Sequence, residues 1–537
     1  MWGLGKVTLE HIAALEEFVI EQSFSRLIRL ELVGLGNFGK WVASQDADHM
    51  FPLLQVLIIK DCPKLFELPF ASQIVYTSDQ DQNSGWFPKL QELLIKKCPE
   101  LLLVAHIPWT ETLHSVNVSD VKLLENLVYS TNSLDGCILA ITGKGDLQSL
   151  DEVVAFNNLA GLDQLRLKRC PPLQSKHLLL LTSLKKLTVE EGSDGVVVER
   201  SEGVVEWQHT LEHLVVQGEE SCGKELTEIL AHLPSLSQLE INECEKITQL
   251  AVGLDVQQAA SAATASEVEE KEEDDSGMLL LPAHLSGTLK LLGINSCPEL
   301  VLVDPPSTFL PTRGGLLALR SLKTLQIHVC PKILSAKSSP SCCPFPSSLQ
   351  YVSVECVEGM GTLGPLLTAG GQIIQLRIGH SPGFFDGWNQ DLKQQLRSGG
   401  KEQEQQQLQE LYTDDAMGFL VVPICNLLSF SLTLLWLSNN QEMERFTKEQ
   451  EDALHLLVSL QKLMFFNLAK LQSLPAGLQK LTNLKSLSVC ICPAFRSLPK
   501  DGLPKSLQQL HVYSYGNEEL KQQCRGLVGI IPKIILE

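Results

Sequence analysis

The sequence predicts an α/β repeat fold, in which short parallel strands stack along a solenoid and irregular or helical segments connect them. Three observations predict it: a pattern of leucine and cysteine that recurs along the chain, a hydrophobic content of 44% with only 6% aromatic residues, and a length of 537 residues. Length alone allows several domains or one elongated array, and the recurring pattern selects the array. The aliphatic composition supplies a core made mainly of leucine.

The stretch LQVLIIKDCPKL at 54–65 returns as LQELLIKKCPEL at 90–101. Counted from the first leucine as offset 0, apolar residues fall at offsets 0, 3, 5 and 11, and cysteine falls at offset 8. Copies with this cysteine begin at Leu54, Leu90, Leu162, Leu236, Leu289, Leu322 and Leu484. Weaker copies begin at Leu27, Leu113, Leu134, Leu184, Leu211, Leu349, Ile373, Leu432, Leu460 and Leu507. The resulting array of about 17 copies, mostly 21 to 28 residues apart, has a leucine-rich-repeat period.

The spacing of the apolar residues dictates how the copies fold. Offsets 3 and 5 differ by two, so both side chains leave the same face of a short strand and point into a core. One coil cannot bury its own apolar edge, and successive coils must therefore stack. We expect a horseshoe with a parallel β-sheet on its concave face.

Offset 8 is where the chain leaves the strand and turns. A small inward residue there must satisfy buried backbone groups, which Asn does well and Cys does weakly. The proline that follows most of these cysteines has no amide hydrogen and helps to end the strand. We therefore expect a structural ladder of Cys62, Cys98, Cys170, Cys244, Cys297, Cys330, Asn440 and Cys492.

Segment composition predicts the domain organisation. Residues 1–26 are expected to be an N-terminal cap or a truncated upstream segment, and 27–537 the solenoid. Three inserts should loop out of the outer side: a disordered acidic run at 255–277, a Ser/Pro/Cys loop at 338–348 and a Gln-rich segment at 397–410.

The formal net charge of −20 repels nucleic-acid backbones and anionic membrane surfaces, so proteins are the expected partners. The acidic start, MWGLGKVTLEHIAALEEFVIEQ, does not match a signal peptide, and no run reaches the roughly 18 apolar residues of a membrane-spanning helix. Fifteen cysteines, an odd number, favour reduced thiols over a disulfide framework. We expect a cytoplasmic protein without membrane insertion.

Catalytic and cofactor motifs are weak. GMGTLG at 359–364 matches a dinucleotide fingerprint but lies between two coils without a following βαβ unit, which favours a glycine-rich turn. TGKGD at 142–146 lacks the other residues of a phosphate loop. Cys342 with Cys343, and Cys490 with Cys492, have no second pair or histidine set at zinc-site spacing. The sequence predicts no enzyme, cofactor or metal.

The exposed positions of the strands form two candidate protein-binding groups. Exposed aromatic side chains in a row are typical anchors of protein interfaces. The alternative for both groups is an ordinary solvated or mutually packed strand face. The basic group comprises Lys96, Lys97, Arg166, Lys168, Arg169, Lys185 and Lys186, and the aromatic group comprises Trp436, Met464, Phe466, His511 and Tyr513.

Stretches such as MFPLLQVLIIKDCPKL, CEKITQLAVG, EMERFTKEQEDALHLL and LPAGLQKLTNLKSLSVCICPAFRSLP extend the pattern beyond the frame itself. With them the chain resembles, over nearly its whole length, the C-terminal leucine-rich-repeat region of plant nucleotide-binding leucine-rich-repeat disease-resistance proteins of the cereal type. The resemblance implies a non-catalytic module of innate immunity that binds pathogen effectors or guarded host proteins and regulates a nucleotide-binding switch domain. The coiled-coil and nucleotide-binding domains of that family have no counterpart in these residues.

Another class of protein also carries cysteine at this repeat offset. Some leucine-rich-repeat substrate adaptors of ubiquitin ligases do so, and they dock on the ligase through an N-terminal helical module. Residues 1–26 are too short for such a module. The adaptor is therefore the second hypothesis.

Overall fold

The computed structural model describes residues 4–20, 23–43, 50–68, 87–102, 112–132, 136–191, 196–197, 209–218, 223–254, 277–303, 315–334, 345–358, 372–381, 384–385, 388, 407–513 and 515–537. The chain divides into two compact units. The first comprises Met1–Lys246 with Asp274–Gly277, and the second comprises Ile247–Glu273 with Met278–Glu537.

The first unit is built on short strands, each contributed by a separate coil of the chain. All neighbours run parallel except around one strand, β8. In order of pairing they are β1 (Lys6–Glu10), β3 (Arg29–Val33), β5 (Val56–Lys60), β6 (Glu92–Cys98), β7 (Ser115–Val121), β8 (Leu124–Asn132), β9 (Gly136–Gly143), β10 (Gln164–Lys168), β12 (Lys186–Glu190), β14 (His213–Gln217) and β15 (Gln238–Asn242).

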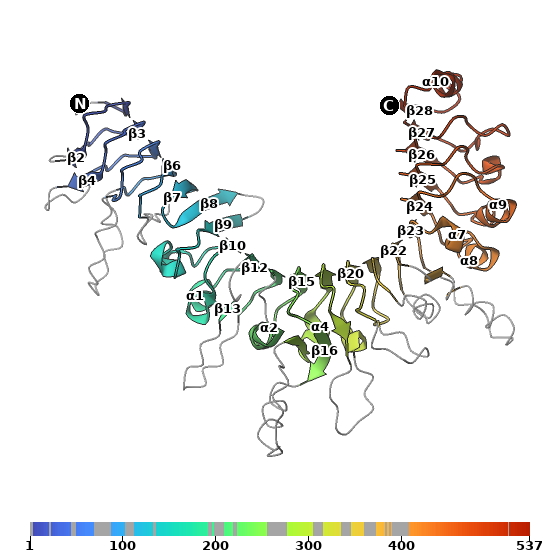
Figure 1. Ribbon diagram of the computed structural model, residues 1–537, viewed down its shortest axis with the longest axis horizontal. Coiled ribbons are helices and arrows are strands. Elements are labelled where there is room, and N and C mark those ends of the chain that lie inside the picture. Colours follow the sequence, from blue (N-terminus) through green and yellow to red (C-terminus); the bar gives the residue numbers. More distant parts are fainter. Residues whose placement is uncertain are drawn as a thin grey trace, which may run out of the picture. The chain divides into compact units, whose positions relative to one another are not determined.

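The second unit repeats this plan with parallel pairing between all its consecutive coil strands. They are β18 (Leu291–Asn295), β20 (Thr324–His328), β21 (Tyr351–Glu355), β22 (Gln375–Gly379), β23 (Glu410–Thr413), β24 (Leu434–Ser438), β25 (Lys462–Phe466), β26 (Ser486–Cys490), β27 (Gln509–Val512) and β28 (Lys533–Leu536). In Figure 1 these strands lie in a row along one side of the unit.

The register places equivalent leucines on one another, as the frame predicts. Leu411, Leu435 and Leu463 are partners across β23, β24 and β25, and all are at most 1% exposed. Burying such side chains contributes roughly 1.5–3 kcal/mol each, which makes the stacked leucines the main stabilising element of each unit.

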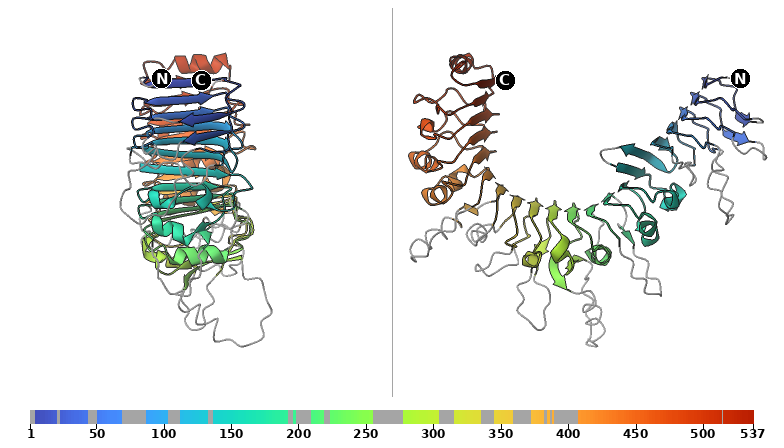
Figure 2. Two further views of the ribbon diagram at one scale, coloured as in Figure 1. Left: turned by 90° about the vertical axis from the view of Figure 1, so that its left-hand side faces the viewer. Right: turned by 180° about the vertical axis from the view of Figure 1, so that it is seen from behind.

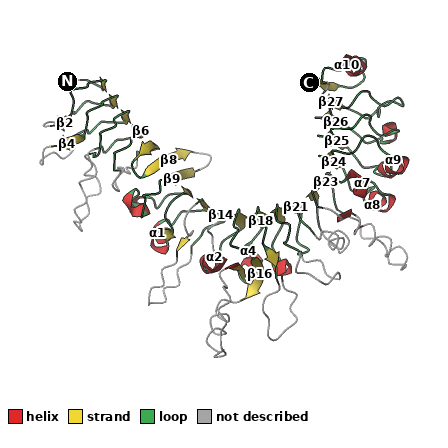
Figure 3. Ribbon diagram, viewed as in Figure 1, coloured by secondary structure: helices red, strands yellow, loops and turns green. Residues whose placement is uncertain are grey.

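Shorter strands and helices form the other sides of the coils. Helices α7, α8 and α9 lie on the side of the second unit opposite its strands (Figures 1 and 3), and the rear view in Figure 2 agrees. The helices are α1 (Ser175–Leu180), α2 (Gly223–Ala231), α4 (Leu285–Thr288), α7 (Ala416–Phe419), α8 (Val422–Leu427), α9 (Lys448–Leu454) and α10 (Glu518–Arg525), with 3-10 turns η2 (Leu150–Glu152), η3 (Phe156–Asn158), η5 (Gly315–Ala318) and η7 (Leu478–Lys480). The short strands are β2 (Glu17–Ile20) with β4 (Lys40–Ala43), β11 (Leu173–Gln174) with β13 (Val196–Val197), and β16 (Gln249–Leu254) between β17 (Met278–Pro282) and β19 (Val301–Leu302).

Among the strands that the structure describes, the parallel order is broken at one place. Strand β8 pairs antiparallel with both β7 and β9, so that a three-stranded meander interrupts the parallel order. The copy expected to begin at Leu134 is also displaced by two residues, because Leu139 and Ile141, at its offsets 5 and 7, pair with Leu165 and Leu167, at offsets 3 and 5 of the next coil.

Two further coils lie where the sequence suggested other structure. Strand β1 lies within residues 1–26, which we expected to be a cap or a truncated upstream segment, and pairs with β3 in the common register. Strand β23 begins inside the segment 397–410, and Leu408 is fully buried. The rest of that segment up to residue 406, residues 255–276 of the acidic run and residues 338–344 of the Ser/Pro/Cys loop lie outside the described part of the chain.

Candidate functional site

The cysteines at offset 8 close the turn after each strand. All seven are buried, and each Sγ lies 3.2–3.5 Å from the carbonyl oxygen two residues earlier. Five of them also lie 3.7–4.0 Å from a strand carbonyl of the preceding coil. A thiol is a weak donor, so these contacts satisfy carbonyls of the turn without creating a reactive centre.

Asn440 occupies the same offset and makes more bonds than a thiol can. Its Oδ1 accepts from the backbone amides of Glu442 and Met443 at 3.0 and 2.9 Å, and its Nδ2 donates to the carbonyl oxygen of Asp414 at 3.3 Å. Ser381 Oγ donates to the carbonyl oxygen of Gly379 at 2.9 Å. Cysteine, asparagine and serine at this offset thus share one structural role, which is to satisfy backbone groups of the turn.

Burial raises the pKa of the ladder thiols Cys170 and Cys492 to about 11, so both stay protonated at neutral pH. Contact with the Cys62 thiol, followed by burial, raises the pKa of Cys98. Because the thiolate is the reactive form, these cysteines are poor nucleophiles and poor metal ligands.

The side chains at offsets 2, 4 and 6 point away from the core and form what we call the open strand face. Most of the predicted basic group lies on it or beside it, but acids of neighbouring coils pair with its members. Five pairs are formed: Lys97–Asp61 (3.4 Å), Arg166–Glu190 (3.8 Å), Lys168–Glu191 (3.0 Å), Lys185–Asp163 (3.1 Å) and Arg169 with Glu125. Lys96 and Lys186 are half-buried on β6 and β12.

These pairs change what the basic group can do. Five of the seven cations have an anion beside them, so the group presents interleaved charges rather than a concentrated positive field. Arg166 is 60% exposed and Lys97 71% exposed, so a partner could still reach them. The arrangement is that of a solvated ion-pair ladder.

An aromatic row crosses three adjacent strands of the second unit. It consists of Tyr412 on β23, Trp436 on β24 and Phe466 on β25, with ring centroids 5.4 Å apart for the first pair and 5.6 Å for the second. The interplanar angles of 40° and 61° are tilted and edge-to-face geometries, which aromatic pairs favour. The row therefore forms one packed apolar ridge on the open strand face.

A pocket of about 200 Å³ opens beside this row. The Arg377 guanidinium carbon lies 4.7 Å from the Tyr412 ring centre, a cation–π contact, and Tyr412 Oη donates to Glu410 at 3.1 Å. Aromatic, cationic and acidic groups thus share one concavity. The lining residues are Glu355, Arg377, Ile378, Gly379, His380, Tyr412, Thr413, Asp414, Trp436, Ser438, Asn439 and Phe466.

The predicted aromatic group separates into two parts. Met464 is the direct strand partner of Trp436, so it belongs with the row. His511 on β27 contacts Tyr513, the residue after this strand, with ring centres 5.5 Å apart. The Sγ atom of Cys490 on β26 lies 3.8 Å from His511 Nδ1.

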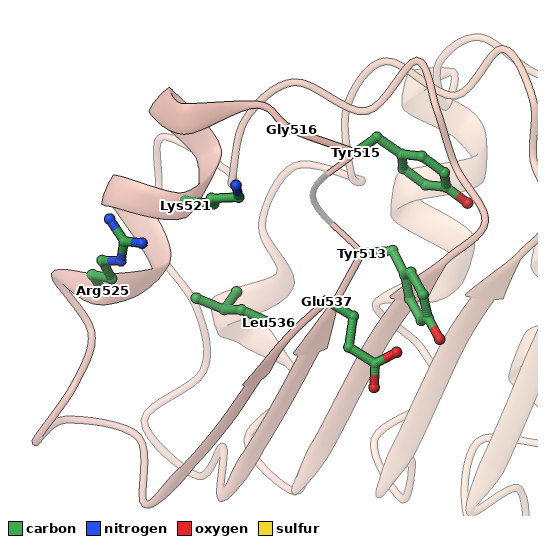
Figure 4. Close-up of a pocket in the computed structure, with 7 residues that line it drawn as sticks. All are labelled: Tyr513, Tyr515, Gly516, Lys521, Arg525, Leu536 and Glu537. Atoms are coloured by element: carbon green, nitrogen blue, oxygen red, sulfur yellow. The ribbon is translucent and has the colours of Figure 1, made fainter.

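A second cavity, of about 380 Å³, lies next to Tyr513 (Figure 4). Tyr513 and Tyr515 form one side, and Lys521 and Arg525 of α10 face them across Glu537 and Leu536. Hydrogen bonding to Glu537 raises the pKa of the Tyr513 hydroxyl. Opposite charges share the lining, so no single ligand charge is favoured.

Sequence reasoning missed Tyr412, Arg377, Glu355 and Asp414. Tyr412 lies in LQELYT, where Leu408, Leu411 and Thr413 occupy offsets 0, 3 and 5. Because threonine is polar, the frame did not identify this copy. In the structure Thr413 is nevertheless buried, with 1% exposure, and its Oγ1 accepts a hydrogen bond from the Asp415 amide. Allowing threonine at offset 5 would have found Tyr412.

The weak motifs add no catalytic centre among the described residues. Lys144 of TGKGD donates through Nζ to the carbonyl oxygen of Val121 at 2.6 Å, a structural bond. Cys492 belongs to the ladder. GMGTLG at 359–364 and the pair Cys342 and Cys343 lie outside the described residues.

Comparisons with known proteins assign no family to the chain. No protein-family model matches the sequence, and no curated protein matches it significantly. Within the described ranges, none of the helices combines the length and apolar character needed to cross a bilayer.

Proposed function

We propose that the chain is a leucine-rich-repeat solenoid of horseshoe form that recognises a protein partner and catalyses no reaction. The frame of leucines, the common register of the strands and the buried turn ladder support this fold. A repeat array of this kind exposes one long strand face, which is the surface such proteins use for binding.

The observation that carries the recognition role is the row of Tyr412, Trp436 and Phe466 beside the pocket. Tryptophan, tyrosine and arginine are the residues most enriched among the energetically dominant contacts of protein interfaces. Here Arg377, Tyr412 and Trp436 lie on three adjacent strands, and Tyr412 contacts both of the others. The interleaved charges of the first unit would then add orientation rather than affinity.

The motifs quoted above favour a role in plant innate immunity. We propose that the partner is a pathogen effector or a guarded host protein, met in the cytoplasm, and that binding regulates a nucleotide-binding switch. The acidic net charge supports a protein partner over nucleic acid.

Small-angle scattering tests the solenoid. A compact globule of 537 residues would have a radius of gyration of about 24 Å. An elongated array should give a value well above this, with a pair-distance distribution skewed to long distances. A value at the compact limit would refute the solenoid.

A binding screen tests recognition. The purified chain would be screened by biolayer interferometry against a panel of effector proteins and host proteins. For a partner found there, Trp436→Ala should weaken binding at least tenfold, which corresponds to about 1.4 kcal/mol. Phe466→Ala should act in the same direction.

Phe430→Ala is the matched control. Phe430 is 76% exposed and lies in the turn before β24, outside the open strand face. It should leave binding unchanged, and all three variants should keep the wild-type melting temperature within a few degrees. Equal losses from Trp436→Ala and Phe430→Ala would contradict recognition through the row.

A further inference from the structure

Three side chains with metal-ligating atoms meet where β21 and β22 end. Glu355 is the last residue of β21, Cys356 follows it, and His380 follows the last residue of β22. One carboxylate oxygen, the Sγ atom and one imidazole nitrogen lie within 4.8 Å of one another. The cluster therefore offers oxygen, sulfur and nitrogen donors at one point.

The repeat geometry explains why they meet. Cys356 and His380 both occupy offset 7, and both have left-handed backbone, with φ of 55° and 47°. Glu355 and Gly379 are direct strand partners, so the two turns lie one above the other. Cys356 lies one position before the buried ladder and is only half-buried, so a metal ion from solvent can reach its thiol.

A second carboxylate comes from the next coil. Asp414 Oδ2 lies 3.5 Å from His380 Nδ1 and accepts from the His380 backbone amide at 2.8 Å. Glu355 Oε1 lies 3.6 Å from the same nitrogen. The imidazole nitrogen thus lies near two acids, which together create a negative potential that a cation would neutralise.

The geometry points to a binding site for a divalent transition metal of the zinc class, with Glu355, Cys356 and His380 as ligands and Asp414 as the supporting carboxylate. Thiolate and imidazole ligands select zinc, cobalt and similar ions over calcium or magnesium. Bonds of about 2.0–2.3 Å in a tetrahedral site place ligand atoms roughly 3.3–3.8 Å apart, close to the 3.6 Å between Glu355 Oε1 and His380 Nδ1. The thiol loses its proton to solvent when the metal binds.

The site adds to the proposed recognition surface without depending on it. Glu355, His380 and Asp414 line the same pocket as Trp436. Three protein ligands leave a fourth coordination position for water or for a donor atom of a partner.

Cobalt(II) titration of the full chain, kept reduced with a non-chelating phosphine, tests the inference. We expect one equivalent to bind with a sulfur-to-cobalt charge-transfer band in the near ultraviolet, and zinc to displace it. Cys356→Ser should abolish the band. His380→Gln and Glu355→Gln should each weaken cobalt binding at least tenfold, while circular dichroism stays that of the wild type.

Cys490→Ser is the matched control. Cys490 also lies beside an imidazole, at 3.8 Å from His511 Nδ1, but the acid there, Glu537, lies 3.4 Å from the other ring nitrogen, Nε2. These groups therefore do not converge on one point, and this variant should keep the full band. Absence of the band in the wild type, its survival in Cys356→Ser, or its loss in Cys490→Ser would each overturn the proposal.

Discussion

The residue before each turn of the ladder adopts left-handed backbone in coil after coil. At offset 7, φ is 54° at Asp61, 55° at Lys97 and 54° at Glu243. Glycine and asparagine accept this conformation easily, whereas β-branched residues are strained in it. The same offset holds Val329, with φ 55°, and Ile491, with φ 54°, so two coils carry avoidable strain.

Val329→Asn should therefore stabilise the protein by about 0.5–1 kcal/mol, a part of the roughly 1–2 kcal/mol that left-handed backbone costs a branched residue. Val329 is 48% exposed, so the change removes little packing. Urea unfolding measures the effect. Val458→Asn is the control, because Val458 is 42% exposed and is not among the residues with positive φ. Equal effects from both variants would rule out backbone strain as the cause.

Leucines and cysteines of one coil should contribute very different amounts to stability. Leu239 and Cys244 are both 0% exposed. Leu239→Ala loses transfer energy and leaves a cavity, at a cost of about 2–5 kcal/mol. Cys244→Ala loses weak hydrogen bonds, at a cost of about 0.5–1.5 kcal/mol. Guanidinium unfolding of both variants compares them, and a larger cost for the cysteine would show that the ladder carries the stability of the coil.

At the element scale, the leucine frame predicts most strands because burial and side-chain period are local properties of the sequence. The leucine frame did not predict the meander at β8. The reversal of this strand depends on how Leu124 and Leu127 pack against neighbouring strands and not on any local pattern. The frame did not predict the coil at β23 either, because Thr413 replaces an apolar residue at offset 5.

The candidate site could be predicted only in part. The frame places Trp436, Met464 and Phe466 on the open strand face from their offsets alone. Pairing between charges on different coils, such as Lys168 with Glu191, depends on side-chain conformations across strands. The convergence of Cys356 and His380 depends on left-handed turns of adjacent coils, which the frame does not describe.

Reversing the basic charges of β10 should affect stability little. Exposed ion pairs contribute about 0–1 kcal/mol, and Arg166, Lys168 and Arg169 are 36–60% exposed. The triple change to glutamate should therefore shift the melting temperature by only a few degrees. It should weaken the binding of any partner that uses this surface. An equal loss of stability and binding would show that these residues support the fold rather than a recognition surface.

Two half-buried histidines on the strands should make stability depend on pH. Burial, followed by the nearby Lys186, lowers the pKa of His213, although Glu240 lies 2.9 Å away, and burial lowers the pKa of His328. Below the unfolded value of about 6.5 the unfolded chain then binds more protons than the folded one, so stability falls as pH decreases from 6.5.

Chemical unfolding at pH 8, 6.5 and 5.5 measures this dependence. His213→Gln and His328→Gln should each flatten the loss between pH 6.5 and 5.5, and pH 8, where both imidazoles are neutral in either state, supplies the reference. The variant that carries both substitutions is the control for other groups. If its unfolding free energy still falls with pH as steeply as that of the wild type, the effect belongs to groups other than these two histidines.

At the scale of the whole molecule, each coil contacts mainly the coils beside it. In such arrays stability is approximately a sum of coil terms and nearest-neighbour interfaces, so damage should spread only over a few coils. The division of the chain into two compact units adds a natural limit to that spread. Hydrogen exchange resolves these local stabilities in a way that a single melting temperature cannot.

Leu435→Ala tests this locality. Leu435 is fully buried on β24 between its partners Leu411 and Leu463. The expected cost of about 2–5 kcal/mol should speed amide exchange at least tenfold on β23, β24 and β25, because each 1.4 kcal/mol is a factor of ten. The effect should decline along β22 and β21 and be absent from the first unit. Leu57→Ala, at an equally buried position on β5, should give the opposite distribution. If both variants instead raise the amide exchange rate uniformly throughout the chain, the protein unfolds as one cooperative body, because a local loss of stability then affects every amide equally.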